Sequence, residues 1–257
     1  MRARKLTDTH EILTFLETDP SYAAYAIGDL EPALFDQTEW ECAEEDGQLR
    51  TIALLFRGLD PPPLFLMGDP AGLPTILRLG LRPERVYVTC RQRHLTAVRA
   101  FYRTEPPTPM WRMTVQAKDF RPIEAPPVIA LSPRHTDALE RLYVQGGGDA
   151  FSPTQLATGV FYGVADRGRI VAAAGIHLIS PTYDVAAVGN VYTHRAYRGR
   201  GYGSATTSAV VAELFRRGIR HVVLNVAQAN TVAIRIYERL GFTKYCPFLE
   251  MLAVRRA

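Results

Sequence analysis

Residues 193–204 read Thr-His-Arg-Ala-Tyr-Arg-Gly-Arg-Gly-Tyr-Gly-Ser, and this glycine- and arginine-rich segment decides the fold of the chain. It follows an apolar, strand-like run at 185–192 and precedes residues 205–217, where apolar side chains recur at helical spacing. Glycine lets the backbone take a positive φ and lets a ligand approach closely. The exposed N–H groups of such a turn and the positive end of the helix dipole attract anions. We therefore expect this turn to hold a phosphate group.

The spacing of the glycines narrows the kind of phosphate site. A Walker loop needs Lys-Ser or Lys-Thr after its last glycine, and this segment has neither. The dinucleotide fingerprint G-x-G-x-x-G fails because Ser204 stands in place of the third glycine. The pattern Arg-x-x-Gly-x-Gly, formed by Arg198, Gly201 and Gly203, resembles the pyrophosphate loop of the GNAT superfamily of N-acetyltransferases. The alternative is a glycine-rich turn that binds no ligand.

A second motif lies downstream, at residues 225–242. It resembles the N....N..A...Y...GF segment of the same family, with Asn230, Ala233 and Tyr237 at matching positions. Asn230 is also a suitable N-cap for the helix that follows, and Gly241 a suitable left-handed stop. Two motifs in the family's order support the resemblance.

The resemblance implies a mixed α/β protein with the GNAT fold, in which helices flank a central, twisted, mixed sheet whose parallel strands splay apart. It covers residues 126–257, including a match at 189–194 to a bacterial subgroup of these enzymes, and extends weakly to residues 1–125. The domains that we predict are an N-terminal α/β domain at 1–121, a proline-rich connector at 122–127 and a GNAT acetyltransferase domain at 128–257.

The two halves carry an internal echo. Residues 97–101 can be laid on residues 233–237, which matches alanine with alanine and arginine with arginine. Each segment follows a β-rich strand. We interpret the first half as a degenerate GNAT-like copy that supports the fold without catalysing, because it lacks the glycine-rich loop and has Phe101 where the second half has a tyrosine.

Hydrophobic periodicity and turn residues predict the other elements. In the first half they indicate helices at 10–18, 21–30, 73–79 and 95–102, and strands at 51–56, 64–67, 86–89 and 111–115. In the second half they indicate helices starting at 133 and 153 and at 205–217 and 231–240, and strands at 128–131, 161–165, 170–179, 185–192, 222–226 and 242–252. Asp166-Arg167-Gly168 is the strongest hairpin signal. The acidic segment 36–46 is interpreted as a solvated loop or strand face.

Composition indicates a globular protein, with 47% hydrophobic and 22% charged residues, no apolar run long enough for a membrane span and no signal peptide. Residues 1–125 carry a net charge of −3 and residues 126–257 one of +7. A small polyanion such as coenzyme A explains this excess without nucleic acid, for which there is no reading module. The three cysteines are far apart, which predicts reduced thiols in a bacterial cytoplasm and no metal site.

Acetyl transfer needs a deprotonated amine, donors for the oxyanion and a proton for the leaving thiolate. The resemblance implies that the thioester lies between splayed strands ending at Thr193 and Val226, and that Tyr237 is the general acid. The alternative for Tyr237 is a tyrosine that is simply buried in a helix. The resemblance also implies a set of residues that bind acetyl-CoA: Val191, Tyr192, Thr193, Arg198, Gly199, Arg200, Gly201, Tyr202, Gly203, Ser204, Asn225, Asn230, Ala233 and Tyr237.

The residues leave the general base open. Many relatives carry a glutamate on the strand before the glycine-rich turn, which we call the cradle. This chain has Asn190 there, and its amide cannot take a proton but can position a water. His177, Asp149, His194 or a water relay are the alternatives, although a histidine satisfied within the sheet is the simpler interpretation of His177. Asp184 is the sole carboxylate between residues 170 and 213.

Three functions follow from this reading. The first is an N-acetyltransferase that moves an acetyl group from acetyl-CoA to a primary amine of a small molecule in a ternary complex, acting as a monomer or homodimer. The second is a protein or peptide N-acetyltransferase, which needs an open groove. The third is a non-catalytic acyl-CoA-binding sensor, favoured by the missing carboxylate. The sequence does not identify the acceptor.

Overall fold

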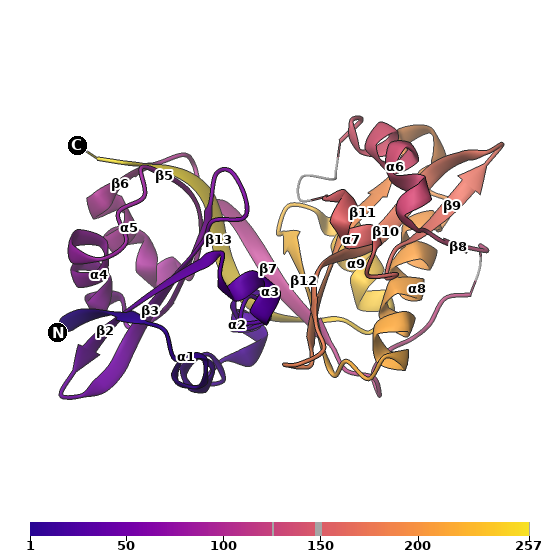
Figure 1. Cartoon of the computed structure of the whole chain (residues 1–257). Helices are drawn as coiled ribbons and strands as arrows, with labels where there is room; N and C mark the ends of the chain where they lie inside the picture. The colour runs from indigo at the N-terminus through magenta and orange to yellow at the C-terminus, as the bar shows by residue number, and fades with distance from the viewer. Residues whose placement is uncertain (125, 147–150, 257) are drawn as a thin grey trace. The chain divides into compact units, whose positions relative to one another are not determined.

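A computed structural model describes residues 1–124, 126–146 and 151–256 (Figure 1). The chain folds into two compact units. Unit 1 contains Met1–Trp111, Ala227–Ala229 and the residues from Cys246 on, and unit 2 contains Arg112–Val226 and Asn230–Tyr245. The units therefore do not follow one another along the chain, and the division falls at Trp111 rather than at the proline-rich segment. The assignment of roles to residues 1–121 and 128–257 stays a prediction.

Unit 1 is a mixed sheet covered by helices. Its elements are β1 (Arg2–Leu6), α1 (Thr9–Leu16), α2 (Pro20–Gly28), α3 (Pro32–Phe35), β2 (Thr38–Glu45), β3 (Gln48–Phe56), β4 (Pro63–Gly68), η1 (Pro70–Gly72), α4 (Leu73–Leu79), β5 (Arg85–Cys90), η2 (Gln92–His94), α5 (Leu95–Phe101) and β6 (Tyr102–Thr104). Strands β1 to β4 pair antiparallel in chain order, β4 pairs parallel with β5, and β5 pairs antiparallel with β13 (Thr243–Arg255). Helices α4 and α5 pack on this sheet and close its apolar core.

Unit 2 repeats that plan. It holds the later part of β7 (Thr108–Val115), followed by β8 (Ile129–Ala130), η3 (Pro133–His135), α6 (Thr136–Tyr143), α7 (Pro153–Leu156), β9 (Tyr162–Asp166), β10 (Arg169–Ser180), β11 (Val185–Thr193), η4 (Arg195–Tyr197), α8 (Tyr202–Arg216), β12 (His221–Ala227) and α9 (Thr231–Arg239). Strands β8 to β11 pair antiparallel, β11 pairs parallel with β12, and β7 lies beside β12.

The pairing pattern of the two units is thus the same: four antiparallel strands, one parallel neighbour, and a last strand from another part of the chain. In unit 1 that last strand is β13, from the end of the chain, and in unit 2 it is β7. Helices α5 and α9, which carry the echo at 97–101 and 233–237, each follow the parallel strand. The topology supports the interpretation of the chain as an internal duplication.

Most predicted elements are present, with shifted ends. The hairpin between β9 and β10 turns at Arg167 and Gly168, both with positive φ, as the motif predicts. The acidic segment proves to be strand β2, in which Trp40 and Cys42 are buried while neighbouring glutamates lie toward solvent. Strands β1 and β6 were not predicted. Within the described ranges, no helix has both the length and the apolar character needed to cross a membrane.

Candidate active site

The glycine-rich segment forms an open turn at the start of α8. Gly199 and Gly201 both have φ of 77°, which places them in the left-handed region, and Gly201 is the N-cap residue of the helix. An added Cβ at either position would meet no heavy atom closer than 3.9 Å, so the turn is not filled by neighbouring side chains. The N–H groups from Gly199 to Ser204 donate to no acceptor in the described part of the chain, while Ala205 N–H begins the helical ladder by donating to Gly201 O at 3.0 Å. These main-chain donors are free to bind an anion.

Arginine and tyrosine side chains surround this turn. Arg198 Nε donates to Thr193 O at 3.2 Å, which fastens the turn to the end of β11. The Arg200 guanidinium lies 5.1 Å from the Tyr197 ring centre, and the Tyr197 hydroxyl donates to Asp166 at 2.8 Å. The rim of the turn is therefore positively charged and held by contacts on both sides.

Strands β11 and β12 separate close to this turn. Their parallel pairing runs from Val185–His221 to Val188–Leu224 and stops there, although β12 continues to Ala227 and β11 to Thr193. The cause is a bulge in β11 at Asn190, where the register against β10 shifts. Asn190 has φ of 53°, a left-handed conformation that asparagine tolerates better than most residues. The edges of the two strands beyond Val188 and Leu224 thus form the splay that the resemblance implies.

Helix α9 begins at the predicted Thr231 and ends at Arg239, one residue before the predicted end. The Asn230 side chain accepts a hydrogen bond from Ala233 N–H at 3.1 Å, as expected of an N-cap. Gly241 has φ of 97°, and a Cβ there would lie 2.0 Å from Asp119 O, so this position requires glycine. Tyr237 is buried, 7% exposed, with its ring 6.0 Å from that of Phe242. Burial raises the pKa of the Tyr237 phenol to about 12, which keeps it protonated at neutral pH.

A profile of the acetyltransferase (GNAT) family matches residues 129–242, which includes the turn, the bulged strand and α9. Residues 129–242 belong to the GNAT family. Over 48 residues the chain is 52% identical to a mycothiol acetyltransferase of Thermobispora bispora, which is 19% of this chain and 16% of that protein. Over 61 residues it is 33% identical to a [ribosomal protein bS18]-alanine N-acetyltransferase of Haemophilus ducreyi, which is 24% of this chain and 42% of that protein. The match thus spans less than half the length of either relative.

Among solved structures, the chain is similar to a GCN5-related N-acetyltransferase of Sphaerobacter thermophilus, with a TM-score of 0.65 at 20% identity. That likeness covers 99% of this chain and 96% of the other, so it includes both units. The GNAT fold of the whole chain is thereby confirmed, whereas the two sequence relatives concern only parts of it.

The open turn of the GNAT domain fits the diphosphate of coenzyme A. Unpaired main-chain donors at a helix N-terminus, two glycines with positive φ and adjacent arginines are the features that such an anion requires. Gly203 lets the start of α8 lie close to the end of β11, since a Cβ there would come 3.3 Å from Thr193 Oγ1.

Two of the predicted site residues, Asn190 and His177, are linked by hydrogen bonds to Gln155, a residue that was not predicted. Gln155 of α7 accepts a hydrogen bond from Asn190 Nδ2 at 3.1 Å and donates one to His177 O, also at 3.1 Å. His177 lies at a bulge of β10, between the pairs Ile176–Val188 and Leu178–Ala187. Its ring covers Gly189, where a Cβ would lie 2.2 Å from Nε2. The bulge breaks the simple alternation expected of that strand and sets the imidazole beside the residue that precedes Asn190.

The remaining candidates for the general base have other contacts or are not described. Asp184 precedes β11, at the opposite end from the cradle, and its carboxylate binds the backbone and side chain of Arg220. His194 Nδ1 accepts from Ala196 N–H at 3.2 Å and caps η4. Asp149 lies outside the described residues. Of His177, His194 and Asp149, the residue that the structure shows beside the bulge is therefore His177.

Sequence reasoning missed two residues at the bulge. Tyr143 donates its hydroxyl to Asn190 O at 2.6 Å, and Gln155 binds the Asn190 side chain. Tyr143 lies on the helix predicted to start at 133, and its side chain is buried. The Ser152-Pro153 pair predicted a helix start, and Gln155 occupies the position at which a capping box places a glutamine. That signal predicts the helix but not the contact with β11.

Proposed function

We propose that the chain is an acetyl-CoA-dependent N-acetyltransferase that acts on the primary amine of a small molecule. The observation that carries the proposal is the open turn from Gly199 to Ser204, with unpaired N–H groups at the head of α8 and diverging strands beside it. The name of the T. bispora relative, a mycothiol acetyltransferase, favours a small-molecule acceptor. The name of the H. ducreyi relative favours a protein alanine as the alternative.

Each group of the site has a separate task in this proposal. The turn, with Arg198 and Arg200, holds the diphosphate of the acyl carrier, and the edges of β11 and β12 beyond Val188 and Leu224 bind its pantetheine arm by main-chain hydrogen bonds. Acetyl-CoA, when bound, supplies an activated acetyl thioester. Tyr237 holds a proton on its phenol oxygen for the departing thiolate, because burial keeps the phenol neutral.

The amine must lose a proton to attack. His177 is the described titratable side chain beside the bulge, and its imidazole can take that proton directly or through a water. Asn190 cannot, since an amide is not basic, and this favours a non-catalytic acyl-CoA sensor as the second candidate function. A measurement of turnover distinguishes the two functions, because an acetyltransferase releases coenzyme A from acetyl-CoA and a sensor does not.

The test is a thiol-release assay with acetyl-CoA and a panel of amino sugars, amino acids, polyamines and peptides with free N-termini. Faster release with one small amine, accompanied by its N-acetylated product, is the expected result. Release with peptides alone would replace the small-molecule acceptor by a protein. Coenzyme A binding without release for any amine would favour the sensor, and the absence of binding would refute the cofactor assignment.

A further inference from the structure

The Gln155 side chain has a fixed orientation. Its Oε1 accepts hydrogen bonds from Ser152 N–H at 3.0 Å and from Asn190 Nδ2 at 3.1 Å, and its Nε2 donates to His177 O at 3.1 Å. A backbone N–H can only donate and a backbone carbonyl can only accept, so rotating the Gln155 amide by half a turn would break both of these bonds. Oε1 must therefore face Asn190.

This orientation in turn fixes the Asn190 amide. Asn190 Nδ2 donates to Gln155 Oε1 and to Ile176 O, both at 3.1 Å, which uses both of its hydrogens. The residue is 5% exposed, and its Oδ1 has no hydrogen-bond partner among the residues that the structure describes. Leaving a buried amide oxygen without a donor costs about 1–3 kcal/mol. Such an atom calls for a donor that the described residues do not supply, either a water or a bound molecule.

The backbone of Asn190 is held as firmly as its side chain. Tyr143 donates to Asn190 O at 2.6 Å, and φ of 53° at the bulge directs the chain away from β12 just beyond the last pair, Val188–Leu224. The unpartnered Oδ1 thus belongs to the residue at which the two strands part. In the function proposed above, this is where the amine must reach the thioester.

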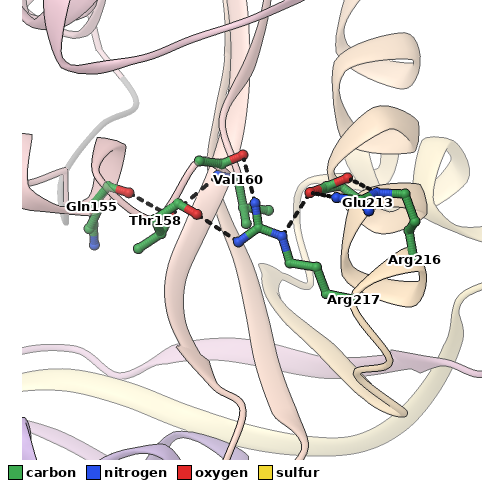
Figure 2. A network of polar contacts seen from close by, with 7 residues as sticks. Gln155, Thr158, Val160, Glu213, Arg216 and Arg217 are labelled. Atoms are coloured by element: carbon green, nitrogen blue, oxygen red, sulfur yellow. Dashed lines mark hydrogen bonds and ion pairs between the residues drawn. The ribbon is translucent and has the colours of Figure 1, made fainter.

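The turn that carries Gln155 is also held against helix α8 by hydrogen bonds. Thr158 Oγ1 donates to Gln155 O and Arg217 Nη1 donates to Thr158 O, both at 2.7 Å. Arg217 in turn pairs with Glu213 near the end of α8, and Figure 2 shows the chain of contacts from Gln155 through Thr158 to Arg217 and Glu213. The same helix begins at the glycine-rich turn, so one rigid element holds both the cradle and the Gln155 segment.

We propose that Gln155 is a positioning residue that holds the Asn190 amide with Oδ1 ready to accept an N–H of the primary amine substrate. This inference rests on the proposed acetyltransferase function. Accepting one N–H from the neutral amine orients the lone pair of its nitrogen and removes no proton. The proton that the amine loses when it is acylated goes to another group. Because neither amide titrates, the orientation is independent of pH. An asparagine at this position therefore serves to orient the amine where a carboxylate would serve as a base.

The kinetic test compares two replacements of similar size. Gln155→Met keeps the packing but cannot accept from Asn190, whereas Gln155→Glu keeps an oxygen that accepts from Asn190 and gives up the bond that Nε2 donates to His177 O. We expect Gln155→Met to lower kcat/KM for the best small amine of the panel about tenfold or more, and Gln155→Glu to stay within about threefold of wild type, with coenzyme A affinity unchanged in both. Thr154→Ala, on the exposed side of the same helix, is the matched control. Wild-type kinetics in Gln155→Met, or equal losses in the two variants, would overturn the proposal.

A second readout needs no turnover. In wild type, both Asn190 side-chain amide protons are buried and bonded, so they should exchange slowly with solvent by NMR. Gln155→Met should speed the exchange of at least one of them about tenfold while the melting temperature stays close to wild type. Unchanged exchange would show that Gln155 does not orient Asn190. This result is distinct from a failure of the amine panel, which would refute the acetyltransferase function instead.

Discussion

Leu66 in unit 1 and Asn190 in unit 2 occupy equivalent positions, and the backbone carbonyl of each accepts a hydrogen bond from a tyrosine hydroxyl. Each lies two residues beyond a parallel pair of matching register, Leu64–Val88 in one unit and Val188–Leu224 in the other. The donors are Tyr22 at 2.9 Å and Tyr143 at 2.6 Å, each from a helix that lies between the first and second of its unit's four antiparallel strands. The duplication thus extends from topology to a buried side-chain contact.

Beyond this shared contact the two units differ. In unit 1, His94 Nε2 donates to Gly68 O at 3.0 Å, and Asp69 accepts from Ala71 N–H at 2.9 Å. A carboxylate therefore already binds the main-chain donor at the turn after β4, where unit 2 leaves its donors free. We predict that the chain binds one coenzyme A, in unit 2. Calorimetric titration should give a stoichiometry of one, and a value of two would contradict the assignment of unit 1 as a non-binding copy.

The two positive-φ glycines that flank α8 offer a matched test of the cradle. Gly201 at its start and Gly218 after its end have φ of 77° and 86°, and neither has a neighbouring atom closer than 3.9 Å to an added Cβ. Replacing either by valine forces a left-handed β-branched residue, at a cost to stability of about 1–2 kcal/mol. We expect both variants to melt earlier, but only Gly201→Val to lose coenzyme A binding in the same titration. Equal affinities would place the ligand away from the turn.

Much of unit 2 could be predicted from sequence because its signals are local. The positive φ at Gly201, the cap at Asn230 and the stop at Gly241 each depend on a few neighbouring residues. Strand β2 was predicted only as a solvated loop or strand face, because its glutamates hide the alternation of Trp40 and Cys42 toward the core. The exchange of β7 and β13 between units, and the contact of Gln155 with Asn190, depend on partners far away in the chain, about which periodicity carries no information.

Tyr237→Phe tests the source of the proton for the thiolate. The substitution removes one oxygen from a buried ring beside Phe242, so the packing should survive. We expect turnover to fall about 100-fold, the lower end of the range for general acids, with coenzyme A affinity nearly unchanged. Steady-state rates and direct titration measure the two effects separately. Undiminished turnover would remove Tyr237 from this role.

The same phenol should affect stability at alkaline pH. Burial raises the pKa of Tyr237 to about 12 in the folded chain, above the unfolded value of 10. Its stabilising contribution is therefore complete below pH 10 and is lost as pH rises toward 12. Chemical denaturation of wild type and Tyr237→Phe should give a free-energy difference that shrinks or reverses over this interval. A difference that is constant from pH 8 to 12 would indicate that the phenol is not buried.

Glu213 predicts a pH effect at the acid end. Hydrogen bonds from Arg216, and then from Arg217, lower the pKa of its carboxyl to about 2 (Figure 2). A lowered pKa means that the contribution to stability is complete above the unfolded pKa of about 4.5 and is lost as pH falls through 2. Glu213→Gln should therefore destabilise the fold by about 1 kcal/mol or less at pH 7, and the difference from wild type should vanish near pH 2. Glu238→Gln, which removes an exposed pair with Lys244, is the control and should have a smaller effect at pH 7. Equal melting curves of Glu213→Gln and wild type at pH 7 would show that the brace between α8 and the Gln155 turn does not stabilise the fold.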